Sequence, residues 1–227
     1  MTLRFRRHAG NIQDSVAIEI DTLVIAGWAG RNAAAIEHHI EELAALGIPR
    51  PSTTPLFYRV AAETLTQTDK LTVLGPDGSG EVEPVIVSMA DGLWVGIGSD
   101  HTDRKAEAHG IALSKQMCGK PVGIELWRYE DVEKHWDELQ LRSWMTIAGK
   151  KTLYQESSIS ALRSPRDLVE RYTGGKSLPT GTLMFCGTPA AIDGIRMGSR
   201  FEMEITDPVL QRSLRHAYDV VELPVVS

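Results

Sequence analysis

The sequence feature that most constrains the fold is a pair of apolar runs joined by Asp91 and Gly92. The runs are Val85–Met89 and Leu93–Ile97. An Asp-Gly dipeptide between apolar runs is the strongest short-range signal for a β-hairpin. We therefore predict two neighbouring strands here, inside a β-rich region that ends near Asp100.

Three acidic residues flank this hairpin. Glu81 and Glu83 precede the first run, and Asp100 follows the second. Because Glu81 and Glu83 are two apart on a strand, their carboxylates point to one face. Like charges beside a buried run repel each other and are costly to desolvate. A hard cation such as Mg²⁺ or Mn²⁺ removes that cost, because oxygen ligands are those it prefers. A solvated strand face is the alternative, and on the Glu-x-Glu pair alone it is the commoner outcome.

Composition excludes several classes of protein. The chain has 227 residues, of which 42% are hydrophobic and 24% charged, as in ordinary globular proteins. A net charge of −6 argues against nucleic acid or an anionic membrane as the main partner. No apolar stretch approaches the length of a membrane span. Because Cys118 and Cys186 are the two cysteines and lie far apart, we expect buried, inert thiols and a cytoplasmic location.

The rest of the chain alternates short β-like runs with a few helices. Ile36, Ile40 and Leu43 recur at helical spacing, and Ser164 followed by a proline is typical of a helix start. No linker divides two cores, so we expect one continuous domain. We predict helices at 31–46, 103–117, 131–141 and 164–172, a second hairpin at 144–154, and strands at 3–7, 16–20, 22–26, 182–186, 200–206 and 217–223.

Several segments, taken in order, resemble motifs of the fumarylacetoacetate hydrolase (FAH) family. Each motif is weak alone, but their order along the chain makes the match specific. The likeness runs from about Ile25 to Tyr218, and it is greatest to the short, divergent members, a branch of unknown function among them. The matching segments are Ser99–Arg104, Gly119-Lys120, Ile147–Gln155, Ser177–Pro189 and Met197–Ile205.

The resemblance implies a fold, an assembly and a metal site. The fold is α+β and predominantly β, a mixed β-sheet roll with peripheral helices, usually as a homodimer. Residues 1–60 would form N-terminal strands and a lid helix, and residues 61–227 the catalytic core. Carried over residue by residue, the ligands of Mg²⁺ or Mn²⁺ are Glu81, Glu83 and Asp100.

The short members of that family carry a His-x-x-Glu-Leu on the lid helix, which His39 and Glu42 match here. Spacing of three places the two side chains on one helical face, so Glu42 would orient His39 as a general base towards water. His38 and Glu41 offer the same spacing one residue earlier, and the register stays open. A solvated, charged helix face is the alternative.

Other positions carry a functional and a structural interpretation. Lys120 would stabilise an enolate or carboxylate, and the alternative is that it is an ordinary surface lysine. Arg104 would pair with a neighbouring acid or bind a substrate carboxylate. Thr188 would hold a substrate oxygen or only shape a turn. Arg59 stands where the family has lysine after Phe-x, and would bind substrate. His101 would point away from the metal site, into the core or behind the ligands.

The leading functional hypothesis is a metal-dependent hydrolase of a C–C bond in a 1,3-dicarbonyl or acylpyruvate-like oxo acid. One rival keeps the fold but changes the reaction to decarboxylation, isomerisation or hydration. Another is a non-catalytic dimer that binds metal or oxo acids. Two departures from the family bear on the pocket: Pro84 follows Glu83, and only 16 residues separate Glu83 from Asp100.

Overall fold

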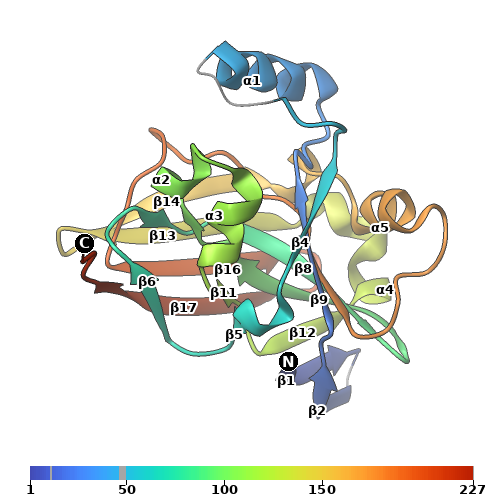
Figure 1. Cartoon of the computed structure of the whole chain (residues 1–227). Helices are drawn as coiled ribbons and strands as arrows, with labels where there is room; N and C mark the ends of the chain where they lie inside the picture. The colour runs from blue at the N-terminus through green and yellow to red at the C-terminus, as the bar shows by residue number, and fades with distance from the viewer. Residues whose placement is uncertain (11, 46–49, 227) are drawn as a thin grey trace.

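Two β-sheets and a few peripheral helices make up the protein in the computed structural model, which describes residues 1–10, 12–45 and 50–226 (Figure 1). The strands of the two main sheets are β1 Thr2–Ala9, β2 Ile12–Glu19, β3 Thr22–Gly27, β4 Leu56–Val60, β6 Lys70–Leu74, β8 Val82–Met89, β9 Gly92–Ser99, β12 Glu125–Arg128, β13 Gln140–Ile147, β14 Lys150–Ser158, β15 Thr182–Phe185, β16 Arg200–Asp207 and β17 Arg212–Leu223.

The larger sheet has eight strands in the order β2-β1-β12-β9-β8-β15-β3-β4, and the smaller has five in the order β14-β13-β16-β17-β6. Both contain parallel and antiparallel pairs; β15 runs parallel to β3 and antiparallel to β8. Two short pairs stand beside them. They are β7 Gly78–Ser79 with β10 Thr102–Asp103, and β5 Leu65–Thr66 with β11 Lys120–Pro121.

The helices are short and peripheral. They are α1 Ala33–Ala45, α2 Arg104–Glu107, α3 Ile111–Met117, α4 Tyr129–Val132 and α5 Pro165–Thr173, with 3₁₀ turns η1 Ala62–Thr64, η2 Glu133–Glu138 and η3 Ile159–Ala161. Figure 1 shows α1 standing above the sheets, apart from the other helices. Across the described residues, every helix is too short or too polar to cross a bilayer.

Strand β8 lies at the centre of the apolar core and is buried along its whole length. Ile86 faces a cluster that it shares with residues of the five-stranded sheet, such as Ile205. Val85 and Val87 face a second cluster on the opposite side, together with Phe185. A strand covered on both faces has no solvated side, which explains its near-continuous apolar run.

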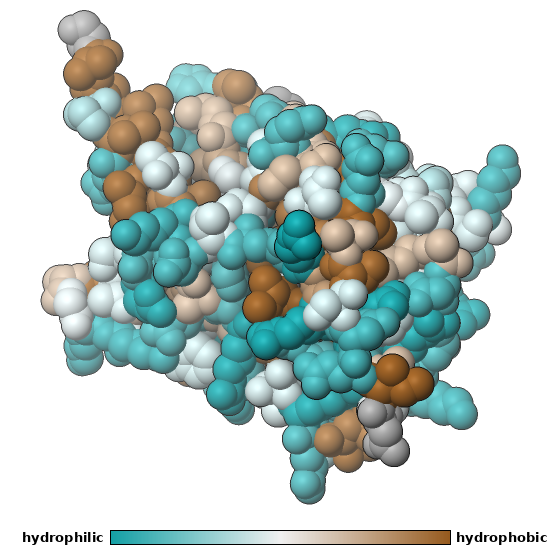
Figure 2. Space-filling model, turned by 90° about the horizontal axis from the view of Figure 1, so that it is seen from below, coloured by the Kyte–Doolittle hydropathy of each residue, from teal (hydrophilic) through white to brown (hydrophobic). Residues whose placement is uncertain are grey.

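The outer surface is mostly polar. Viewed from below, exposed apolar side chains gather at the C-terminal segment, at the left edge of the molecule (Figure 2). Val225 and Val226 are among them. Both cysteines are buried free thiols, as expected from the sequence.

Most predicted elements are present, and two helices differ. Both hairpins form, and Ser164 caps α5 by accepting a hydrogen bond from the Asp167 amide. The continuous helix expected over 103–117 is instead two helices separated by residues 108–110, where Gly110 precedes α3 and glycine is disfavoured in a helix interior. The helix expected over 131–141 is a short α4 and a 3₁₀ turn, and strand β13 already begins at Gln140.

Candidate metal centre and active site

The three acidic residues are brought together by the register of the β8–β9 hairpin. Glu83 pairs with Gly98, and two residues further along each strand Asp100 lies opposite Glu81, where the Asp100 amide donates to the Glu81 carbonyl at 3.1 Å. Side chains alternate along a strand, so residues 81, 83, 98 and 100 share one face. The carboxylates of Glu81, Glu83 and Asp100 offer ligand atoms that lie within 4.8 Å of one another.

Gly98 completes this arrangement because it has no side chain. A Cβ at this position would lie 2.6 Å from the ring of Phe185. Any other residue opposite Glu83 would displace that buried ring. Pro84, the departure noted in the sequence, is accommodated: β8 continues through it, and its carbonyl accepts a hydrogen bond from the Cys186 amide at 3.0 Å.

Burial governs the charge of Glu83. Its side chain is buried, and desolvation raises its pKa well above the ordinary value, with the nearby charges of Asp100 and Glu81 adding to the shift. The amide of Gly187 donates to Glu83 Oε2 at 2.7 Å. A carboxyl in this setting holds its negative charge only when a cation supplies compensation.

Arg104 is the partner of Glu81. Its Nη2 donates to Glu81 Oε1 at 2.7 Å, its Nε to Ser79 Oγ at 2.7 Å, and its Nη1 to Glu107 Oε2 at 3.1 Å. Burial alone would lower the pKa of Arg104, but Glu81 and Glu107 outweigh it and the net shift is upward. Of the two roles weighed for Arg104, the structure places it with the neighbouring acids.

Two lysines contact Asp100. Lys115 forms an ion pair with Oδ2 and lines the cavity described below. Lys120 lies 3.1 Å from Oδ1, is fully buried, and donates to the His101 carbonyl at 2.5 Å. Burial alone would raise the pKa of Asp100, yet the two lysines outweigh it and the pKa is lowered.

The sequence pointed to Lys120 and missed Lys115. Lys115 is the one lysine among the described residues that line the cavity. Burial alone would lower its pKa, but Asp100 and Glu81 raise it more, so Lys115 stays protonated. Burial lowers the pKa of Lys120. Lys120 contacts Asp100 from within the core, whereas Lys115 lines the cavity.

A buried hydrogen-bond network supports the acidic cluster. Tyr218 Oη lies 2.8 Å from Ser99 Oγ and 3.0 Å from His101 Nδ1, so it contacts both chain neighbours of Asp100. Ser99 Oγ accepts from the Glu81 amide at 3.2 Å. His101 thus lies behind the ligands and in the core, as expected from the sequence.

Gln155 supports the same strand from the smaller sheet. Its Oε1 accepts from the Val82 amide at 3.0 Å and from Ser143 Oγ at 2.8 Å. Its Nε2 donates to Thr188 Oγ1 at 2.8 Å and to the Pro189 carbonyl at 2.7 Å. Because Val82 lies between the two glutamates, Gln155 fixes their strand against the loop that closes the cavity.

A cavity of about 480 Å³ opens onto the acidic cluster. That volume lies within the usual range for small-molecule sites, about 300–1,000 Å³. It is bounded by the ends of β3 and β8, by α1 and α3, and by the loop after β15. The side chains that line it include those of Trp28, Ile36, Tyr58, Glu81, Glu83, Glu107, Ile111, Lys115 and Thr188.

The remaining candidate residues are distributed unevenly. Thr188 lines the cavity, but its hydroxyl donates to the Val82 carbonyl at 2.9 Å and accepts from Gln155, so it shapes the loop. Arg59 lies outside the described lining: it is exposed and donates to Tyr172 Oη of α5 at 3.3 Å. Positions 39 and 42 are in α1, but the side chains of His39 and Glu42 lie outside the described part of the structure.

The donor set fits a divalent cation. It consists of three carboxylates, the ligand type that Mg²⁺ and Mn²⁺ prefer. Asp100 Oδ1 is buried and accepts no hydrogen bond of good geometry from the described residues, although Lys120 lies near it. A buried carboxylate oxygen left without a donor is costly, and a metal ion removes that cost.

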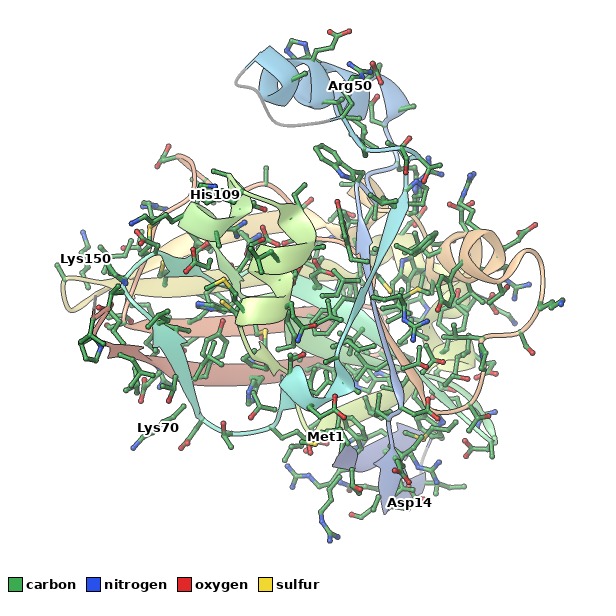
Figure 3. The ribbon with its side chains drawn as sticks, in the orientation of Figure 1. Met1, Asp14, Arg50, Lys70, His109 and Lys150 are labelled. Carbon is green, nitrogen blue, oxygen red and sulfur yellow. The ribbon has the colours of Figure 1, made fainter. Side chains whose placement is uncertain are left out.

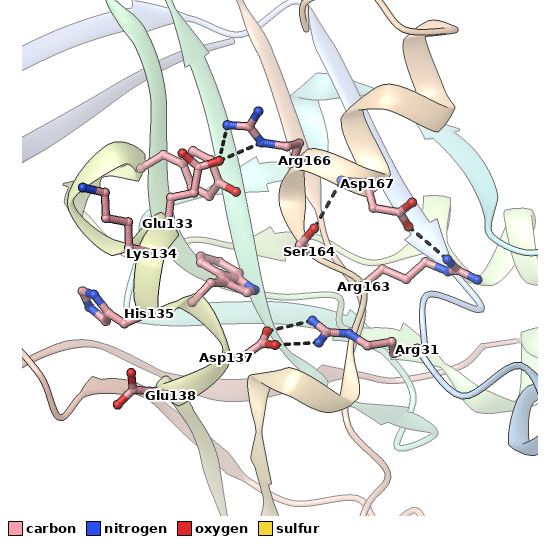
Figure 4. A pocket seen from close by; sticks show the side chains of 12 residues that line it. Arg31, Glu133, Lys134, His135, Asp137, Glu138, Arg163, Ser164, Arg166 and Asp167 are labelled. Carbon is pink, nitrogen blue, oxygen red and sulfur yellow. Dashed lines mark hydrogen bonds and ion pairs between the residues drawn. The ribbon is translucent and has the colours of Figure 1, made fainter.

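A second cavity, of about 580 Å³, lies near α4 and α5 (Figure 4). Most of its charged side chains pair with one another. Arg31 donates to both carboxylate oxygens of Asp137, and Arg166 pairs with Glu133. Paired charges leave little unsatisfied potential for a ligand, so the smaller cavity at the acidic cluster is the better candidate site.

The profile of the DUF2848 family, described as proteins of unknown function, matches residues 26–218. The chain belongs to the DUF2848 family. No curated protein matches this DUF2848 chain. The match covers every residue of the acidic cluster and the basic residues around it.

Solved structures show which fold this DUF2848 protein has. A 2-keto-3-deoxy-D-arabinonate dehydratase complexed with magnesium and 2,5-dioxopentanoate aligns with TM-score 0.64 and 17% identity, over 95% of this chain and 79% of that one. The yeast protein ynq8, of the FAH family, aligns with TM-score 0.64 and 14% identity, over 92% and 96%. Cg1458 with inhibitor aligns with TM-score 0.67 and 16% identity, over 92% and 81%. The FAH-like fold expected from the sequence is confirmed.

Proposed function

We propose that this protein is a divalent-metal-dependent enzyme that hydrolyses a C–C bond in an acylpyruvate-like 2-oxo acid. The observation that carries the proposal is the cluster of Glu81, Glu83 and Asp100, in which Glu81 and Glu83 line a cavity of ligand size and Asp100 is buried beside them. The three carboxylates would hold Mg²⁺ or Mn²⁺. When bound, the ion would supply Lewis-acid polarisation of the 2-oxo carboxylate end of the substrate.

Charge balance favours an anionic substrate. The three carboxylates are matched by three basic side chains, and Glu107 adds one further negative charge at the edge. A divalent cation would leave the site with a positive excess. Oxo acids carry a carboxylate, and their enolates carry one more negative charge, so both are attracted to such a site. The basic side chains are Arg104, Lys115 and Lys120.

Lys115 would act as an electrostatic group. Its raised pKa keeps the ammonium charged, which suits stabilisation of an enolate oxygen and excludes a role as general base near neutral pH. Its partner Asp100 holds it in place. Ile36 and Ile111 contribute apolar walls that limit water near the reacting atoms.

The reaction balances with water alone. The water oxygen bonds to the distal carbonyl carbon, and the bond between that carbon and the methylene carbon breaks. The electron pair goes to the pyruvate enolate, which then takes a proton at carbon. The products are a carboxylic acid and pyruvate. His39 on α1, oriented by Glu42, would take the proton from water.

Dehydration or decarboxylation of a related oxo acid is the second candidate. A decarboxylation needs no activated water, and therefore no general base of the kind proposed for His39. The similar fold of the dehydratase complexed with magnesium and 2,5-dioxopentanoate adds to this candidate.

A metal-exchange assay tests the proposal. The protein, stripped by chelator and reloaded with Mg²⁺ or Mn²⁺, is assayed for loss of acetylpyruvate and for release of pyruvate. We expect activity with metal and none without it. Turnover that persists in the stripped protein would refute metal dependence. Turnover of other oxo acids without C–C hydrolysis would favour the second candidate. No turnover and no metal binding would identify a non-catalytic protein.

A further inference from the structure

A third cavity, of about 440 Å³, adjoins the one at the acidic cluster. The two cavities share part of their wall, so they are neighbours at the same end of the molecule. Tyr58 contributes from β4, and Glu107 and Ile111 come from α2 and α3. The shared residues are Trp28, Tyr58, Glu107 and Ile111.

The adjoining cavity offers apolar surface to a ligand. Leu56 and Pro51 line it on one side and Ala112 of α3 on another. Two of its charged side chains already have partners: Arg50 pairs with Glu37, and Glu107 with Arg104. Arg50 comes from the side of α1 and His109 from the α2–α3 pair (Figure 3).

The conformation of the shared wall is tightly constrained. Trp28 has φ of 58°, the left-handed region that a bulky side chain rarely adopts, so the surrounding structure enforces its position. The side chain of Trp28 hydrogen-bonds to Tyr58. A Cβ on Gly27 would lie 2.6 Å from the Tyr58 ring, so glycine is required for the ring to lie there.

Tyr58 also connects the wall to the charged end of the site. The ammonium of Lys115 lies 5.8 Å from the centroid of the Tyr58 ring. A molecule whose carboxylate end reaches Lys115 and the acidic cluster would therefore pass Tyr58 and Trp28 before it enters the adjoining cavity. Aromatic walls on this path favour an apolar chain or ring.

We propose that the adjoining cavity is the subsite for the acyl substituent of the oxo acid, and that this substituent is a chain of several carbons or an aromatic ring. The proposal rests on the proposed function for the identity of the charged end. Both cavities lie in the volume range of about 300–1,000 Å³ that is typical of sites for larger ligands. An acetyl group would leave the adjoining cavity unused.

The experiment compares substrates and ligands of increasing length on the metal-loaded protein. For turnover, kcat/KM is measured for acetylpyruvate and hexanoylpyruvate. For binding, calorimetry is used with pyruvate and 2-oxooctanoate, neither of which has a 1,3-dicarbonyl bond to cleave. Each methylene moved from water to an apolar cavity raises affinity about fourfold. We expect hexanoylpyruvate and 2-oxooctanoate to be favoured over their short counterparts by at least tenfold.

A filled-cavity variant and a matched control locate the subsite. Ala112→Phe places a ring in the adjoining cavity from an exposed helix position, so it should fold. Leu113→Phe adds bulk at the next position of α3, which is exposed and outside both described linings. We expect Ala112→Phe to cut the preference for the long member at least tenfold, and Leu113→Phe to keep it.

The outcomes separate this proposal from the proposed function. Equal binding of short and long oxo acids by the unmodified protein, or an unchanged preference in Ala112→Phe, would overturn the subsite. If no acylpyruvate is hydrolysed but 2-oxooctanoate still binds more tightly than pyruvate, and Ala112→Phe removes that preference, the subsite stands and hydrolysis is refuted.

Discussion

Lys115, which lines the cavity at the acidic cluster, forms a buried ion pair with Asp100. Breaking a buried pair from one side costs about 3–5 kcal/mol, and loss of one charged donor at a reacting oxygen costs about 10²–10³ in kcat. We predict both losses for Lys115→Met, measured by denaturant unfolding and by acetylpyruvate turnover. Lys115→Arg keeps the charge and is expected to recover most of the stability. Full activity in Lys115→Met would remove Lys115 from the site.

We expect Tyr218 to strengthen metal binding, although it lies far along the chain from the residues of the acidic cluster. Tyr218→Phe leaves Ser99 and His101 without their shared partner, which costs about 1–3 kcal/mol and loosens both neighbours of Asp100. We predict lower stability and weaker Mn²⁺ binding by calorimetry. Tyr154→Phe is the matched control, because Tyr154 is similarly buried but, among the described residues, its hydroxyl accepts only one hydrogen bond, from the Arg196 amide at 3.4 Å. Equal effects of the two changes would contradict the positioning role.

His101 predicts how the stability of the metal-free protein depends on pH. Burial, with Lys120 adding to it, lowers the pKa of His101 to about 3. In the unfolded chain the pKa is about 6.5, so between these values the unfolded state binds more protons and stability falls as pH falls. From pH 8 to pH 5 this loss is about 2 kcal/mol. His101→Gln should lack that part of the slope in urea unfolding; a parallel slope would refute the assignment.

Water activation is tested at α1. If His39 is the general base, His39→Ala should lower acylpyruvate hydrolysis about 10²–10⁴-fold and leave any oxaloacetate decarboxylation intact. His38→Ala is the control. The reverse result would assign the base to the pair one residue earlier, His38 with Glu41. Loss of neither activity would remove α1 from the chemistry.

Local signals were sufficient for most of the strands and for the acidic cluster, but β12 at Glu125–Arg128 was not predicted. Asp91 and Gly92 set the hairpin register, and that register alone places Asp100 opposite Glu81. Helix α5 was also predicted from a local signal, because Ser164 caps its N-terminus. The prediction of one helix over 103–117 was wrong, because the helix is interrupted before α3, where Gly110 stands.

Long-range contacts account for what the sequence did not provide. Lys115 appears as one more lysine on a short helix, and its pairing with Asp100 arises only when α3 packs against the sheet. Tyr218 reaches His101 across 117 positions of chain, and Gln155 reaches Val82 across 73. Such contacts depend on how two sheets meet, which no periodicity of a single strand encodes.

The central claim is that Glu81, Glu83 and Asp100 hold a divalent cation. The most direct measurement is the anomalous difference density of crystals grown with Mn²⁺. We predict one strong peak in contact with all three carboxylates, which disappears in Glu83→Gln. A map without a peak between the three residues, at Mn²⁺ concentrations that saturate calorimetric binding, would contradict the account.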